Sequence, residues 1–285
     1  MLKQRVITAL ILLAILLPAL FYSASTVPFA VLMLIFMAAG AWEWGRLNGF
    51  GQAGSLVLGA ICTAMCAGSW WAGWLDQPLT TLWVVVGALW VLGGVLLLKA
   101  GVAGWPHIPA AVRLVAGVLA LWLAWMAVVK ARNMGVNFLL SVLVLVWVAD
   151  IFAYFAGRTF GLKFTKNKLA PSISPGKSWE GVWGGMMGVV VLALVWSWAD
   201  RHYGATVPSF YSLLQLRGTW FLLLAAVFMA AMSVVGDLVE SLIKRSVGVK
   251  DSSGLLPGHG GVLDRIDALL PTLPLAMMLS SLVHS

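Results

Sequence analysis

The chain alternates long apolar blocks with short polar stretches. Most blocks are long enough to cross a bilayer core about 30 Å thick as an α-helix, which rises about 1.5 Å per residue. The pattern therefore predicts an all-α, polytopic integral membrane protein with about nine transmembrane helices. The predicted spans are residues 6–24, 27–45, 53–74, 80–98, 109–129, 136–156, 182–199, 219–236 and 268–283.

The composition supports a membrane environment. Hydrophobic residues make up 61% of the 285 positions, and charged residues only 10%. Soluble domains carry about 25% charged residues, so this chain could not cover a water-facing surface. Cys62 and Cys66 lie inside an apolar block with no histidine or further cysteine nearby, so we interpret them as small core residues.

The basic residues are unevenly distributed between the two sides of the predicted membrane. Of the 18 lysines and arginines, fourteen fall on the side that holds the N-terminus and four on the other. Because cytoplasmic loops carry an excess of Lys and Arg, we expect the N-terminus in the cytoplasm, together with loops 157–181 and 237–267. The net charge of +8 has the same explanation and does not indicate nucleic-acid binding.

The first block allows two interpretations. Lys3 and Arg5 precede an apolar run that ends in small residues at 23–25, which fits either a signal peptide or a retained span. We favour retention. No linker or repeat divides the chain, so we predict one membrane domain over residues 1–285. Residues 1–135 would form an N-terminal scaffold, and residues 136–285 would carry the chemistry.

The densest polar stretch follows the eighth predicted span. If that helix continues beyond residue 236, Asp237, Glu240, Ser241 and Lys244 lie on one face, at the end of the span. A polar stripe in that place can face a wet cavity.

Two further carboxylates follow at Asp264 and Asp267, which would share a face of a helix. Neighbouring carboxylates favour a cation, and Mg²⁺ commonly binds one or two carboxylates together with substrate phosphates. Pro271 would disturb a helix at residue 267, which we expect to help fix Asp267 for metal binding. An ordinary ion pair between Asp264 and Arg265 is the alternative interpretation.

A glycine-rich loop, Pro257–Gly261, lies between the polar stripe that ends at Lys244 and the carboxylate of Asp264. Its glycines allow backbone N–H groups to approach an anion closely. His259 in this loop fits a general base, a metal ligand or a contact to phosphate. The surrounding positive charge comes from Lys244, Arg245, Lys250 and Arg265. Together the acids, glycines and bases predict a site for a metal ion and a polyphosphate.

A second polar segment begins inside the sixth span. Asp150, Tyr154 and Arg158 recur on one helix face, and a charge within a span is expensive. Either a structural hydrogen bond or a substrate contact would explain Asp150. Residues 174–181 resemble a loop entering a helix, with Ser178 as its cap and an inward-facing N-terminus suited to an anionic head group.

One acidic residue lies near the end of the second span. Glu43 is followed one turn later by Arg46. We interpret the two residues as an interfacial ion pair.

Residues 241–267 resemble the signature of the phosphatidate cytidylyltransferases, also called CDP-diacylglycerol synthases, and residues 150–181 are similar to the stretch that precedes it. Ser178 stands where Thr is often expected, which keeps the hydroxyl. The matching positions of the signature are Ser241, Lys244, Arg245, Lys250, Asp251, His259, Gly260, Gly261, Asp264, Arg265 and Asp267.

The resemblance implies a specific reaction. CTP and phosphatidic acid would react with the help of Mg²⁺, and of a second cation if the site holds one. The metal ligands would be Asp237, Asp264 and Asp267, with Lys244 nearby as a further catalytic residue. The expected assembly is a homodimer in a bacterial inner membrane, surrounded by lipids and with its active site facing the cytoplasm. Substrate contacts are expected from Asp150, Arg158, Ser174, Lys177, Ser241, Arg245, Lys250, Asp251, His259, Gly260, Gly261 and Arg265.

Three alternatives remain open. A CTP-dependent transferase acting on another membrane lipid or a polyprenol would use the same catalytic residues. An ion transporter would place charges near the middle of the membrane. A structural assembly factor would leave the density of charges between Lys244 and Asp267 without a purpose.

Overall fold

The computed structural model describes residues 2–22 and 25–284, so the small-residue stretch at 23–24 lies outside the described residues. Within them, nine helices are long and apolar enough to cross a membrane, which confirms the all-α, polytopic prediction. The elements are α1 (Leu2–Phe21), α2 (Val27–Leu47), α3 (Gln52–Trp71), α4 (Thr80–Gly104), η1 (Trp105–His107), α5 (Ala110–Met134), α6 (Val136–Phe160), β1 (Lys168–Ala170), β2 (Ser174–Ser178), α7 (Trp179–His202), α8 (Phe210–Gln215), α9 (Thr219–Ser246), α10 (Leu263–Ile266) and α11 (Leu269–His284).

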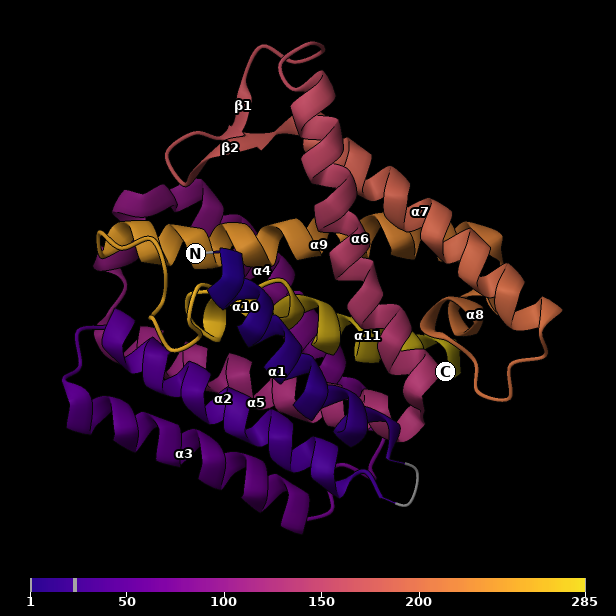
Figure 1. The fold of residues 1–285 in the computed structure, drawn as a ribbon, viewed down its shortest axis with the longest axis horizontal. Coiled ribbons are helices and arrows are strands. Elements are labelled where there is room, and N and C mark those ends of the chain that lie inside the picture. Colours follow the sequence, from indigo (N-terminus) through magenta and orange to yellow (C-terminus); the bar gives the residue numbers. More distant parts are fainter. Residues whose placement is uncertain (1, 23–24, 285) are drawn as a thin grey trace.

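The helices pack as a bundle in which α9 and α11 contact several neighbours (Figure 1). The helices α2, α3 and α5 pack against one another, while α6 packs along α7. α9 contacts α4, α7 and α11, so it joins the N-terminal and C-terminal groups of helices. This position brings the polar end of α9 to a place that both halves of the chain can reach.

Contacts with distant parts of the chain hold α1 in place. At one end, Arg132 donates hydrogen bonds to the carbonyls of Leu20 and Tyr22 at the end of α1. At the other end, Thr8 of α1 donates a 2.9 Å hydrogen bond to the carbonyl of Pro257. The helix α1 is therefore bound to the rest of the protein at Thr8 and at its C-terminal end.

A break in the helical path at Asp267 and Ala268, where α10 gives way to α11, lies at the start of the last predicted span. The break lies one turn before Pro271, as the disturbance expected from that proline predicts. Gly236 of α9 packs against it: a Cβ at this glycine would lie 2.6 Å from the carbonyl oxygen of Asp267 and 2.8 Å from Pro271. Only a glycine allows α9 to approach the broken helix so closely.

The polar segment between α6 and α7 contains a small antiparallel hairpin, which the sequence pattern did not predict. Strands β1 and β2 pair with Lys168 opposite Ser178 and Ala170 opposite Ser174. In Figure 1 the hairpin lies at the edge of the helical body, above α9. The prediction that Ser178 caps the following helix is confirmed, because Ser178 accepts a 3.2 Å hydrogen bond from the N–H of Gly181 at the start of α7.

Candidate functional site

The eighth span continues as a helix past the apolar block, because α9 ends only at Ser246. The predicted polar stripe is therefore helical. Ser241 donates a 3.3 Å hydrogen bond to Asp237 one turn earlier. Lys244 forms an ion pair of 2.5 Å with Glu240, also one turn earlier.

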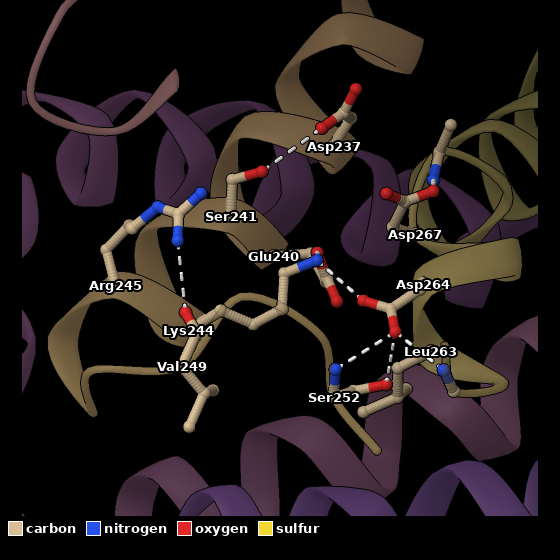
Figure 2. A network of polar contacts seen from close by, with 12 residues as sticks. Asp237, Glu240, Ser241, Lys244, Arg245, Val249, Ser252, Leu263, Asp264 and Asp267 are labelled. Atoms are coloured by element: carbon tan, nitrogen blue, oxygen red, sulfur yellow. Dashed lines mark hydrogen bonds and ion pairs between the residues drawn. The ribbon is translucent and has the colours of Figure 1, made fainter. Parts of the chain in front are cut away.

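Lys244 lies between two carboxylates in a nearly closed environment (Figure 2). Its Nζ atom is 2.5 Å from Oε2 of Glu240 and 2.6 Å from Oδ1 of Asp264. The side chains of Lys244, Glu240 and Asp264 are 11%, 8% and 4% exposed, so all three charges have lost most of their water. Each charge therefore depends on the others for compensation.

Asp264 is also bound by the loop that precedes it. Its Oδ2 atom accepts hydrogen bonds from the N–H of Ser252 at 2.9 Å, from the hydroxyl of Ser252 at 3.0 Å and from the N–H of Gly261 at 2.7 Å. With Lys244 this makes four donors on one carboxylate, which offers about four acceptor positions. Asp264 thus holds Lys244 and both ends of the loop in one arrangement.

The three carboxylates expected as metal ligands are not equivalent. Within the described residues, no three acidic, histidine or cysteine side chains lie close enough together to hold a metal ion. Asp264 points toward Lys244 and Ser252. Asp237 and Asp267 lie on the side of Asp264 that faces away from Ser252 (Figure 2). The hydrogen bond recorded for Asp267 comes from the N–H of Ala268 and occupies only Oδ1. Both oxygens of Asp237 are engaged as well, by Lys177 and Ser241. Asp267 therefore has a carboxylate oxygen left for a metal ion, and the roles of Asp237 and Asp264 as ligands stay predictions.

The two polar segments predicted separately meet at Asp237. Lys177 of strand β2 places its Nζ atom 2.5 Å from Oδ2 of Asp237, and both side chains are about one-third exposed. The hairpin is held in turn by Glu180 of α7, which is buried and accepts hydrogen bonds from the N–H groups of Phe164 and Thr165. A buried acid thus supports the segment that brings Lys177 to the site.

Two polar residues of α6 bond to each other. Tyr154 accepts a 2.9 Å hydrogen bond from Arg158, and this contact does not include Asp150. Asp150 is exposed, and both of its expected roles, a structural hydrogen bond and a substrate contact, stay predictions.

One N–H group of the glycine loop is bound within the protein. The N–H of Gly261 donates to Asp264, and the expectation that the loop binds an anion stays a prediction. Gly260 has a φ of +82°, a conformation that L-residues rarely adopt. Nδ1 of His259 is buried without a hydrogen-bond partner among the described residues, and no contact defines a role for His259.

Four of the residues predicted to contact substrate have exposed side chains. Arg245 donates a 3.2 Å hydrogen bond to the carbonyl of Val249, and its side chain is exposed. Lys250, Asp251 and Arg265 are exposed as well. Their roles stay predictions, but three cations are available around the buried network.

Glu43 corrects the sequence interpretation most clearly. It is fully buried, whereas Arg46 is exposed and lies over the ring of Trp42, so the expected ion pair between Glu43 and Arg46 is wrong. Glu43 instead accepts hydrogen bonds from the glycine-rich segment more than 200 residues away, as described below. The only sequence signal was a charge inside an apolar span.

An apolar cavity of about 390 Å³ adjoins the charged network. It lies between α4, α5 and α9, and Glu240 is the one charged residue in its lining. Gly236, Val239 and Leu263 line it next to the network. A charged centre on one side and an apolar cavity on the other suit an amphiphilic ligand.

These features define a polytopic membrane protein with a polar site at one end of its helix bundle. The chain belongs to the cytidylyltransferase family, whose sequence model matches residues 3–283. This membership confirms the resemblance seen in the motifs and makes the chain a nucleotidyltransferase.

Similar proteins from bacteria cover almost the whole chain. A protein named phosphatidate cytidylyltransferase from Pseudomonas aeruginosa is 39% identical over 278 residues, covering 96% of this chain and 95% of the relative. A protein of the same name from Haemophilus influenzae is 37% identical over 298 residues, covering 96% of each chain. One from Staphylococcus haemolyticus is 31% identical over 281 residues, covering 97% of this chain and 98% of the relative. The similarity therefore extends over the N-terminal helices as well as the two polar segments.

Proposed function

We propose that this chain transfers CMP from CTP to the phosphate of phosphatidic acid, producing CDP-diacylglycerol and pyrophosphate. The names of the full-length relatives support this reaction. The structural observation that most supports the proposed reaction is the 2.5 Å ion pair between Lys177 and Asp237. This contact joins the two polar segments into one site, beside the buried pair of Lys244 and Asp264.

The reaction is an in-line displacement at the α-phosphorus of CTP. A phosphate oxygen of the lipid forms the new P–O bond as the bond to the pyrophosphate leaving group breaks. The lipid phosphate is already ionised near neutral pH, so a strong general base such as His259 is not required. The main barrier is repulsion between two polyanions, which the exposed cations Arg245, Lys250 and Arg265 would reduce.

Mg²⁺ is proposed as the cofactor, with Asp237, Asp264 and Asp267 as its candidate ligands. When bound, it would neutralise charge on the reacting phosphates. The chain's own residues would orient the reactants: Lys177 would reach the site from the hairpin, and Lys244 would be held by Asp264 in a fixed position. Whether a second cation binds stays a prediction.

The membrane arrangement agrees with these substrates. The excess of basic residues on the side of both polar segments supports an active site that faces the cytoplasm, where CTP is available. Phosphatidic acid would remain in the bilayer, here the inner membrane of a bacterium. Assembly as a homodimer also stays a prediction.

The apolar cavity beside Glu240 is the proposed position of an acyl chain of the lipid. It lies among the spanning helices, and its lining is almost entirely apolar, as hydrocarbon requires. Its border with the charged network would keep the phosphate of the same lipid close to Lys244.

Gly93→Leu should therefore weaken binding of the lipid substrate. Gly93 lines the cavity, and a Cβ there meets no atom within 4 Å, so leucine would extend into free space. Losing the burial of about two methylene groups, at about 0.8 kcal/mol each, should raise the KM for phosphatidic acid about tenfold and leave the KM for CTP unchanged. Steady-state kinetics in mixed micelles would measure both constants.

Gly68→Leu is the matched control, because Gly68 of α3 also has no neighbour within 4 Å and does not line the cavity. It should leave both KM values unchanged. Equal effects of the two substitutions, or no effect of Gly93→Leu, would place the acyl chain elsewhere.

An acceptor panel tests the proposed reaction. The purified protein, in detergent micelles with CTP labelled at the α-phosphorus and Mg²⁺, should label phosphatidic acid and leave a polyprenyl phosphate and a neutral diacylglycerol unlabelled. Excess EDTA should abolish the product. Labelling of the polyprenyl phosphate alone would show a CTP-dependent transferase for another lipid and would contradict the proposal.

A further inference from the structure

Glu43 is a charged residue of the N-terminal helices that contacts the polar loop before α10. It belongs to α2 and is 0% exposed. Its Oε1 atom accepts hydrogen bonds from the hydroxyl of Ser253 at 2.6 Å and from the N–H of Val262 at 2.9 Å. Its Oε2 atom accepts from the N–H of Leu263 at 2.8 Å and lies 3.2 Å from the hydroxyl of Ser252.

These donors come from both ends of one loop. Ser252 and Ser253 begin it, and Val262 and Leu263 end it at the start of α10. A single carboxylate therefore closes the loop by binding its two ends. No lysine, arginine or histidine forms an ion pair with Glu43 among the described residues, so its charge is compensated by the donors of Ser253, Val262 and Leu263, with the hydroxyl of Ser252 shared between Glu43 and Asp264.

Glu43 is linked to the catalytic carboxylate through Ser252. The hydroxyl of Ser252 lies 3.2 Å from Oε2 of Glu43 and 3.0 Å from Oδ2 of Asp264, and it has one proton to donate. The N–H of Ser252 also donates to Asp264. Asp264 in turn holds Lys244 at 2.6 Å. The position of Lys244 therefore depends on the loop that Glu43 fixes.

The packing around Gly261 leaves no room for adjustment. A Cβ at Gly261 would collide with the hydroxyl of Ser252 and with the carboxylate of Glu43. The glycine therefore allows Glu43 to approach the loop backbone, and the N–H of Gly261 reaches Asp264 in the same arrangement. Gly261 thus lies against two carboxylates, those of Glu43 and Asp264.

We propose that Glu43 is a positioning residue for CMP transfer, which holds residues 252–263 so that Asp264 and Lys244 face the reacting phosphates. This inference rests on the proposed function for its catalytic part. It assigns a role at the site to the N-terminal half of the chain, which the sequence predicted to be scaffold only. Glu43 does not contact substrate; it acts through Ser252 and Asp264.

Glu43→Gln keeps the size of the side chain but replaces one accepting oxygen with an amide that donates. It should lower kcat about 100-fold, because small displacements of catalytic groups have effects of that size, while the KM for phosphatidic acid changes less than about threefold. Glu43→Ala should lose more activity than Glu43→Gln, because glutamine retains one acceptor for the loop N–H groups.

Asp200→Asn is the matched control. Asp200 of α7 also accepts hydrogen bonds from a backbone N–H and a hydroxyl, those of Ser209 and Ser212. It contacts Asn137 at the start of α6, away from residues 252–263. This variant should lose thermal stability comparably to Glu43→Gln and keep its kcat. Arg46→Ala should leave both quantities unchanged, since Arg46 does not pair with Glu43.

Hydrogen exchange measures the positioning without any reaction. The amides of Val262 and Leu263 should exchange faster in Glu43→Gln than in the parent or in Asp200→Asn. Faster exchange together with the loss of kcat supports the inference. Unchanged exchange, a kcat within twofold of the parent, or an equal kcat loss in Asp200→Asn would overturn it. A parent that lacks activity would refute the proposed function alone, because the exchange of residues 252–263 would still report the anchoring.

Discussion

Lys244→Met should lower the free energy of unfolding by about 3–5 kcal/mol, because it removes the shared cation from two buried carboxylates. Glu240 and Asp264 are only 8% and 4% exposed, so water cannot replace the lysine. Thermal unfolding of the purified protein in detergent should show a clear fall in Tm. Lys99→Met, which changes an exposed lysine of α4, should alter stability by no more than about 0.5 kcal/mol.

A second substitution separates charge balance from catalysis. Glu240→Gln in the Lys244→Met background removes one of the two uncompensated charges and should recover part of the lost stability. It should not recover activity, because the lysine is still absent. Full stability in Lys244→Met, or an active double variant, would contradict the placement of Lys244 as the centre of the network.

Asp264→Asn should reduce kcat at least about 100-fold, since removal of one preorganised polar group typically has an effect of that size. Asparagine has one accepting oxygen for the donors that Asp264 now binds. Its NH₂ group cannot accept a hydrogen bond and would face at least one of these donors. Lys244 would lose its partner at 2.6 Å, and the contacts to Ser252 and Gly261 would weaken. Kinetics on the folded fraction isolated by size-exclusion chromatography would measure the loss.

Asp76→Asn is the control for Asp264→Asn. Asp76 is exposed, and it lies in the connection between α3 and α4. Its replacement should leave kcat unchanged. An Asp264→Asn protein with a kcat close to that of the parent would show that the buried network is structural only.

The spans were predictable from sequence because membrane crossing imposes a length and a composition that are local properties. The continuation of α9 through Lys244 was predictable for a similar reason, since the helical spacing of Asp237, Glu240, Ser241 and Lys244 is local. The hairpin was not predictable from its strands, which are only three and five residues long. It depends on Glu180, whose partners Phe164 and Thr165 lie on the other side of both strands.

Glu43 shows why local reasoning failed at the site itself. Arg46 offered a partner one turn away, so the simplest interpretation was an ion pair. The real partners lie more than 200 residues away and are mostly backbone N–H and hydroxyl groups, which sequence does not distinguish from any others. The cost of a charge within a membrane span was the correct signal, and it pointed to Glu43 as well as to Asp150.

The position of the label in the product tests the central claim most directly. CTP labelled at either the α- or the γ-phosphorus would be supplied with phosphatidic acid and Mg²⁺ to the purified protein. The account predicts that α-label enters the lipid and γ-label appears in pyrophosphate, because CMP is transferred. γ-Label in the lipid would mean phosphoryl transfer, as in a CTP-dependent kinase, and would contradict the account.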